Sequence, residues 1–91
     1  MSFQLMFRVL DTHITDHALG LSPQFPLLDF LDRHQRGDWG VAAVNVRHQN
    51  DHAVLNGGEV ESRFQVGRFY LVIISQVLGG FARSCITIER M

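Results

Sequence analysis

The sequence has no lysine, a single cysteine, two prolines and no long hydrophobic run. With Cys85 alone, no disulfide can form within the chain, so an oxidising compartment is not required. The longest apolar stretch, residues 69–74, is too short to span a bilayer. Residues 1–10 lack the charged and apolar regions of a signal peptide. We therefore expect a cytoplasmic protein that makes no contact with a membrane.

A strong net charge is missing, and so are the sequence motifs of known enzyme classes. The formal net charge is −1 and all eight basic residues are arginines, scattered along the chain, so nucleic acid is not an expected partner. Without lysine there is no P-loop, and the pairs Gly57-Gly58 and Gly79-Gly80 match no other phosphate-binding pattern. A nucleophile elbow is absent as well. We expect neither enzymatic activity nor a cofactor.

The composition of the 91 residues is that of one small folded domain. Hydrophobic residues make up 46% and charged residues 19% of the chain. A chain of this length has room for a single modest core. We expect residues 1–91 to form one domain.

Helical periodicity marks the first half of the chain. Thr15 is suited to cap a short helical turn, and residues 26–36 follow as an amphipathic helix with Pro26 at its first position. Gly37 would end this helix in the left-handed conformation. One face of the helix carries four residues at helical spacing, Leu27, Leu28, Leu31 and His34. Residues 42–56 predict a second helix that ends at Gly57-Gly58.

Alternating and β-branched residues predict strands elsewhere. Residues 3–10 alternate like a half-buried strand, and residues 60–66, 68–77 and 82–90 read as a β-meander with short turns. The predicted class is α+β, with two main helices packed on a three- to four-stranded antiparallel sheet. The strand over 68–77 is apolar on both faces, so we expect a partner or a second copy of the chain to cover the face that the helices leave open.

The tetrapeptide Gly37-Asp38-Trp39-Gly40 is the most distinctive in the chain. Two roles are open for Trp39: a buried indole that pins a corner between helices, or a presented hot spot for a partner. Asn50 falls on the apolar face of the second helix, where a buried amide needs hydrogen-bond partners. The free backbone groups of the corner are the candidates. This assigns Gly37, Asp38, Trp39, Gly40 and Asn50 to a structural corner.

Histidines spaced four apart raise the alternative of a metal site. His13 and His17 form one such pair, and His48 and His52 form another. Each pair would share a helix face, but it supplies only two of the three or four ligands that zinc needs. We expect no metal, with His48 and His52 as weak candidates.

A longer pattern resembles a known family. The run Phe30-Leu31-Asp32-Arg33-His34-Gln35-Arg36-Gly37-Asp38-Trp39-Gly40, followed by Asn50-Asp51-His52-Ala53-Val54, is similar to a motif of small proteins from bacterial plasmids and other mobile elements. The family pattern is R-H-x-x-G-D-W-G, then N-D-x-A, followed by an apolar hairpin. The resemblance implies a mobile-element context. Mobile elements carry small non-catalytic proteins that bind host machinery, including CRISPR and restriction complexes.

We therefore expect a non-catalytic protein-binding module, an inhibitor of a host defence complex, with a host protein complex as its partner. The expected contact residues are Arg33, Arg36, Trp39, Arg47 and Tyr70. Two alternatives stay open: a metal-dependent enzyme that uses the histidines and aspartates, and a small nucleic-acid-binding regulator that uses Arg33, Arg36 and Arg47. A homodimer through the sheet edge or the uncovered face is a separate expectation.

Overall fold

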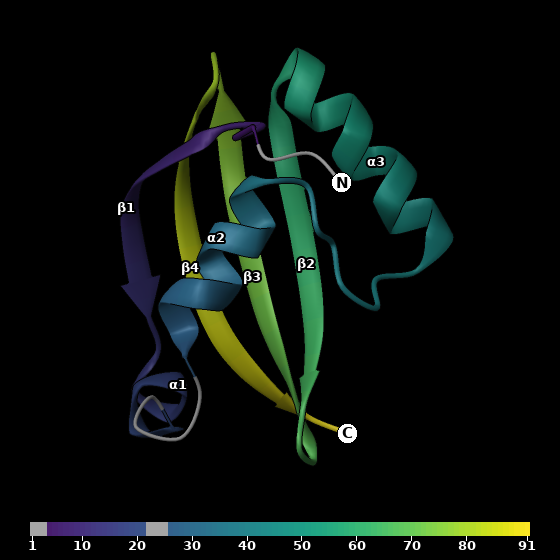
Figure 1. The fold of residues 1–91 in the computed structure, drawn as a ribbon. Coiled ribbons are helices and arrows are strands. Elements are labelled where there is room, and N and C mark those ends of the chain that lie inside the picture. Colours follow the sequence, from purple (N-terminus) through teal and green to yellow (C-terminus); the bar gives the residue numbers. More distant parts are fainter. Residues whose placement is uncertain (1–3, 22–25) are drawn as a thin grey trace.

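A computed structural model describes residues 4–21 and 26–91. It contains one four-stranded sheet and three helices (Figure 1). In chain order the elements are β1 (Arg8–Ile14), α1 (Asp16–Leu21), α2 (Leu27–Gln35), α3 (Val44–Asn56), β2 (Gly58–Val66), β3 (Phe69–Leu78) and β4 (Phe81–Arg90). The α+β class is thus confirmed.

The sheet has the strand order β1-β4-β3-β2. The predicted meander is present, because β2 pairs antiparallel with β3 and β3 pairs antiparallel with β4. The prediction of a purely antiparallel sheet is wrong, because β1 pairs with β4 in parallel. Tight turns force antiparallel neighbours, whereas β1 reaches β4 only through all the intervening elements, so no local turn dictates its direction.

The first strand begins later than its alternating pattern predicts. The expected strand over residues 3–10 starts outside the described residues, and pairing begins only at Arg8, which is in register with Phe81. The Arg8 N–H donates to the carbonyl of Gly80 at 2.8 Å. An irregularity between Val9 and Asp11 then shifts the register. The partner strand, which is remote in sequence, therefore sets where β1 starts.

The helix boundaries follow local signals closely. The Ala18 N–H donates to the Thr15 hydroxyl at 3.3 Å, which caps α1 as expected. Pro26 lies one residue before α2, and Gly37 follows it with φ +84°. Leu28 does not join the buried face of α2, because its side chain is 76% exposed.

The three helices do not enclose the sheet, because α2 and α3 lie on the same face (Figure 1). Every second side chain of the meander points toward them, and these positions are the buried ones except for Val72, which is buried on the other face. Two apolar clusters fill the layer. One joins Phe7, Trp39, Ala42 and Ala53 to Val60, Val77 and Ala82. The other joins Ala18 and Leu27 to Phe64, Val66, Leu71, Ile73 and Ile86.

Candidate functional site

A chain of polar side chains lies inside the helix–sheet layer. His34 on α2 is fully buried, and so are Ser62 on β2 and Ser75 on β3. The His34 ring contacts both serines, with Nδ1 2.5 Å from the Ser62 Oγ and Nε2 2.8 Å from the Ser75 Oγ. The Ser75 Oγ is 2.5 Å from the Ser84 Oγ on β4. One side chain thus links α2 to three adjacent strands.

The direction of each hydrogen bond in this network follows from counting protons. The Ser62 hydroxyl donates to the Asp38 carbonyl at 3.0 Å, so its oxygen must accept from His34 Nδ1–H. Nε2 then carries no proton and accepts from the Ser75 hydroxyl, whose oxygen in turn accepts from the Ser84 hydroxyl. A neutral His34 with its proton on Nδ1 satisfies every group.

Burial keeps the His34 ring neutral. Phe7 and Trp39 meet it edge-on, with ring centroids 5.3 and 5.8 Å away. Loss of hydration disfavours the imidazolium form and lowers the pKa of His34 from 6.5 to about 3. The network is closed to solvent and balanced for a neutral ring, so it serves to lock α2 onto the sheet.

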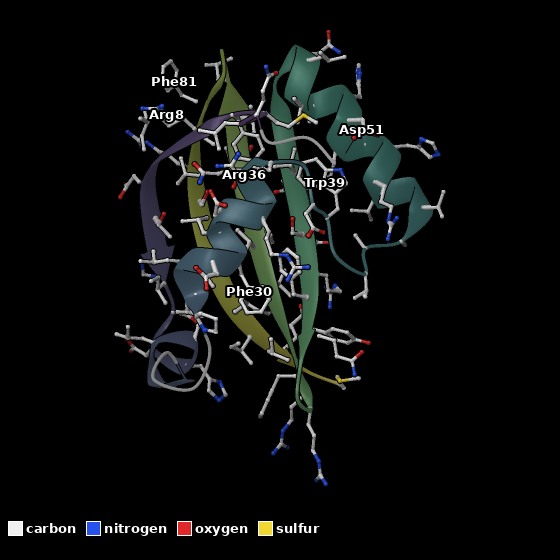
Figure 2. All side chains as sticks on the ribbon, viewed as in Figure 1. Arg8, Phe30, Arg36, Trp39, Asp51 and Phe81 are labelled. Atoms are coloured by element: carbon white, nitrogen blue, oxygen red, sulfur yellow. The ribbon has the colours of Figure 1, made fainter. Side chains whose placement is uncertain are left out.

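The glycine–tryptophan corner is tied to this network and to β2. Trp39 is only 7% exposed, and its indole N–H donates to the Asp51 carboxylate at 3.3 Å, so it packs in the core. Figure 2 shows Trp39 and Asp51 facing one another between β2 and α3. Gly40 lies against Arg63 of β2: the Arg63 N–H donates to the Trp39 carbonyl and the Val41 N–H donates to the Arg63 carbonyl.

Asn50 is buried as predicted, but its partner differs from the one expected. Its amide donates to the Glu61 carbonyl at 2.7 Å and accepts from the Glu61 N–H at 3.0 Å. Asn50 therefore joins α3 to the backbone of β2 and does not serve the corner. The free carbonyls near the corner are taken by Arg47, which donates to the backbone oxygens of Ala42 and Gly40 at 2.9 and 2.8 Å.

The five predicted contact residues do not form one surface. Arg33 pairs with Asp38 at 2.8 Å and lies 4.7 Å from the Phe64 ring centroid, while Arg36 pairs with Asp32 at 3.0 Å. Arg47 belongs to α3, and Tyr70 points to the opposite face of the sheet. Trp39 is enclosed, which favours the structural one of its two roles.

The face of the sheet without helices has two different ends. At one end Arg63 reaches from β2 across β3 to an ion pair with Glu89 on β4, and its guanidinium lies 5.3 Å from the Tyr70 ring centroid. Val72 points to this open face, opposite Arg63 and Thr87, yet it is only 1% exposed. The chain covers this end with its own side chains.

The other end of the same face is apolar and uncovered. Leu78 and Phe81 flank the Gly79-Gly80 turn and are directly opposite one another in the pairing of β3 with β4. Their side chains are 79% and 50% exposed, and that of Leu10 on β1 is 67% exposed. Phe81 lines two hollows. One of 260 Å³ lies beside Leu10 and Leu78. The other, of 490 Å³, lies beside Leu5 and Met6 at the end of the sheet, where the Met6 side chain reaches Gly37, which follows α2.

We call this surface the Phe81 patch and define it as Leu5, Met6, Arg8, Leu10, Leu78, Phe81 and Arg83. Arg83 lines the hollow beside Leu10 and Leu78, and Arg8 lines the hollow beside Leu5 and Met6. Figure 2 shows Arg8 and Phe81 projecting from the same end of the sheet. The sequence contained a partial signal for the patch, because two large apolar residues that flank a two-residue hairpin turn lie opposite one another on the same face of the sheet.

The histidine pairs do not converge on a metal site. Within residues 4–21 and 26–91, no three His, Cys, Asp or Glu side chains lie close enough together to hold a metal ion. The His52 Nδ1 atom is 3.0 Å from the Asn56 amide nitrogen on the exposed side of α3. His48 lies on the same exposed helix. Across the same described ranges, no helix is long and apolar enough to cross a membrane.

Comparison with protein-family models, with curated proteins and with solved structures found no match. The functional argument therefore depends on the geometry of the Phe81 patch.

Proposed function

We propose that this chain is a small non-catalytic protein-binding module and that the Phe81 patch is its contact surface. The observation that carries the proposal is the joint exposure of Leu10, Leu78 and Phe81 at one end of the sheet, beside two arginines. Exposed apolar side chains gathered in one place mark interaction sites more often than scattered ones do.

The composition of the patch is that of an interface centre. Aromatic residues and arginine are enriched at protein interfaces, and hot spots cluster around such anchors. Phe81 is an aromatic anchor next to a two-residue turn. Gly79 and Gly80 have φ +60° and +82°, the conformation of the tight hairpin turns that match sheet twist. The turn thus places Phe81 directly opposite Leu78 at the end of the hairpin.

The buried polar network supports a binding role in place of catalysis. His34, Ser62, Ser75 and Ser84 are the groups best suited to proton transfer or nucleophilic attack, and all four are hydrogen-bonded to one another or to the backbone inside the core. Their role in this structure is to join α2 to the sheet. The surface that remains for the proposed function is the largely apolar Phe81 patch with its two shallow hollows.

The resemblance to plasmid proteins supplies a context for the module. We propose that it comes from a mobile genetic element and acts by covering a surface of a host defence complex, such as a CRISPR or restriction complex. Inhibition by occlusion needs only a stable interface, for which about 800 Å² per partner is typical. A domain of this size can present such a surface.

The test is recovery of a stoichiometric partner that depends on the patch. We expect tagged wild-type protein to retain a partner from host lysate and Phe81→Ser with Leu78→Ser to lose it. Leu28→Ser is the matched control, because Leu28 is 76% exposed on α2, away from the patch. A partner retained equally by the patch variant, or lost equally by the control, would contradict the proposal.

A further inference from the structure

We infer that the Phe81 patch recognises an acidic segment of its partner, in which apolar side chains are flanked by aspartate or glutamate. This inference rests on the proposed binding function and adds the chemistry of the ligand. It follows from the charges around Phe81 and from how the fold uses its other arginines.

Four arginines are committed to contacts within the chain. Arg33 pairs with Asp38 and Arg36 with Asp32, Arg63 pairs with Glu89, and Arg47 bonds to backbone carbonyls. The guanidinium groups of Arg8 and Arg83 make no ion pair or hydrogen bond with any residue in the described part of the chain. The same is true of Arg68 and Arg90 at the opposite end of the sheet. Two of the four uncommitted cations therefore lie beside Phe81: Arg8 is in register with it on β1, and Arg83 follows two residues later on β4.

One nearby acid offsets part of the charge of these two cations without pairing with either of them. Asp11 is in register with Arg83 across β1 and β4, but no ion pair joins them in the described structure. Glu59, two strands away, accepts a hydrogen bond from Gln76 at 3.0 Å. The patch thus presents an excess of positive charge on a chain whose formal net charge is −1.

The two hollows define how an acidic segment would sit. Each has an apolar floor beside Phe81 and one guanidinium at its rim, Arg83 for the first and Arg8 for the second. An apolar side chain in each hollow would bring neighbouring carboxylates to the arginines, whose planar groups bind carboxylates through two parallel hydrogen bonds. A second copy of the chain fits less well, because a twofold axis through Phe81 would gather four guanidinium groups.

The probes are three twelve-residue helical peptides that share the same leucine positions and carry Glu, Gln or Lys at every flanking position. We expect the Glu peptide to bind roughly tenfold more tightly than the Lys peptide at low salt, with a difference that shrinks at high salt. Amide resonances of Arg8, Leu78, Phe81 and Arg83 should shift on binding. Arg8→Glu with Arg83→Glu should reverse the preference.

The matched control is Arg68→Glu with Arg90→Glu, which changes the net charge by the same amount at the opposite end of the sheet. It should leave the preference for the Glu peptide unchanged. If all three peptides bind at Phe81 equally well, the charge inference fails and the binding function stands. If none shifts these resonances, the charge inference fails, and the binding function is decided separately by whether a partner is recovered through Phe81 and Leu78. A dimer in light scattering that Phe81→Ser with Leu78→Ser returns to the monomer mass would overturn the inference as well.

Discussion

The Nε2 atom of His34 accepts a hydrogen bond from the Ser75 hydroxyl at 2.8 Å, across 41 residues of sequence. This bond places an α2 side chain on the central strand of the meander. Together with the Ser62 and Ser84 contacts, it joins α2 to the sheet through buried polar groups that are all hydrogen-bonded. The helix can satisfy these groups in only one position on the sheet.

Replacing either partner of this bond should destabilise the fold. We expect His34→Leu to cost about 2–4 kcal/mol and Ser75→Ala about 1–3 kcal/mol, because each change leaves buried polar groups without a partner. The double variant should cost less than the sum, by roughly 1 kcal/mol. Urea unfolding of the four proteins measures this coupling. His48→Leu, on the exposed part of α3, is the control and should stay within about 0.5 kcal/mol of wild type.

Acid should weaken the protein through the same histidine. Between pH 6.5 and about 3 the unfolded chain binds a proton at His34 and the folded chain does not, so the free energy of unfolding decreases as the pH falls. The slope is about half of 1.4 kcal/mol per pH unit at pH 6.5, approaches the full value at lower pH, and fades above roughly pH 7.5. Unfolding measured from pH 7 to 5 should show this decline, and the free energy of unfolding of His34→Gln should depend less on pH. Equal pH dependence in the wild type and the variant would contradict this prediction.

Gly40 should not tolerate a side chain. It has φ +66°, and a Cβ there would lie 2.2 Å from the Arg63 carbonyl oxygen, a backbone atom that cannot move without breaking the contact to β2. We expect Gly40→Ala to cost well over 2 kcal/mol in thermal unfolding. Gly79→Ala is the matched control: its φ of +60° is similar but no atom lies within 4 Å, so only about 1–2 kcal/mol of backbone strain should appear. Similar losses for both would refute the steric argument.

Asn50→Ala should loosen α3 from β2. The change removes both hydrogen bonds to the Glu61 backbone from a side chain that is buried, at a cost of about 2–3 kcal/mol. Hydrogen exchange at the Glu61 amide should accelerate at least as much as the loss of global stability predicts. The control is Asn56→Ala, because the Asn56 side chain forms its hydrogen bond on the exposed side of α3. It should change neither the stability nor the exchange rate of the Glu61 amide appreciably.

Local signals were sufficient to predict most elements of this fold. Thr15, Pro26, Gly37 and Gly57 mark helix ends because capping and left-handed conformations depend on neighbouring residues only. The alternation of β2, β3 and β4 is equally local. The direction and start of β1 were not predictable in this way, because they depend on Phe81, which lies more than 70 residues away along the chain.

The contacts of the candidate site residues were harder to predict than the fold. The pair of Arg36 with Asp32 follows from their i,i+4 spacing on α2. The partners of Arg33 and Arg47 lie in the loop after α2 and depend on how that loop folds back. His34 and its serines form a network from four elements, and the only hint was one serine at an inward position in each strand of the meander. Long-range pairing decides which polar groups meet.

The parallel pairing of β1 with β4 also constrains the order of events during synthesis. Residues 8–14 leave the ribosome first among the strands but have no edge to join until residues 81–90 have been made and have paired with β3. The opening segment can contact α2 earlier, through Gln35, but it has no strand partner during the assembly of the meander, and its pairing with β4 is the step that completes the sheet. Leu10 and Phe81 come together only at that step, so the Phe81 patch forms only once residues 81–90 have been made.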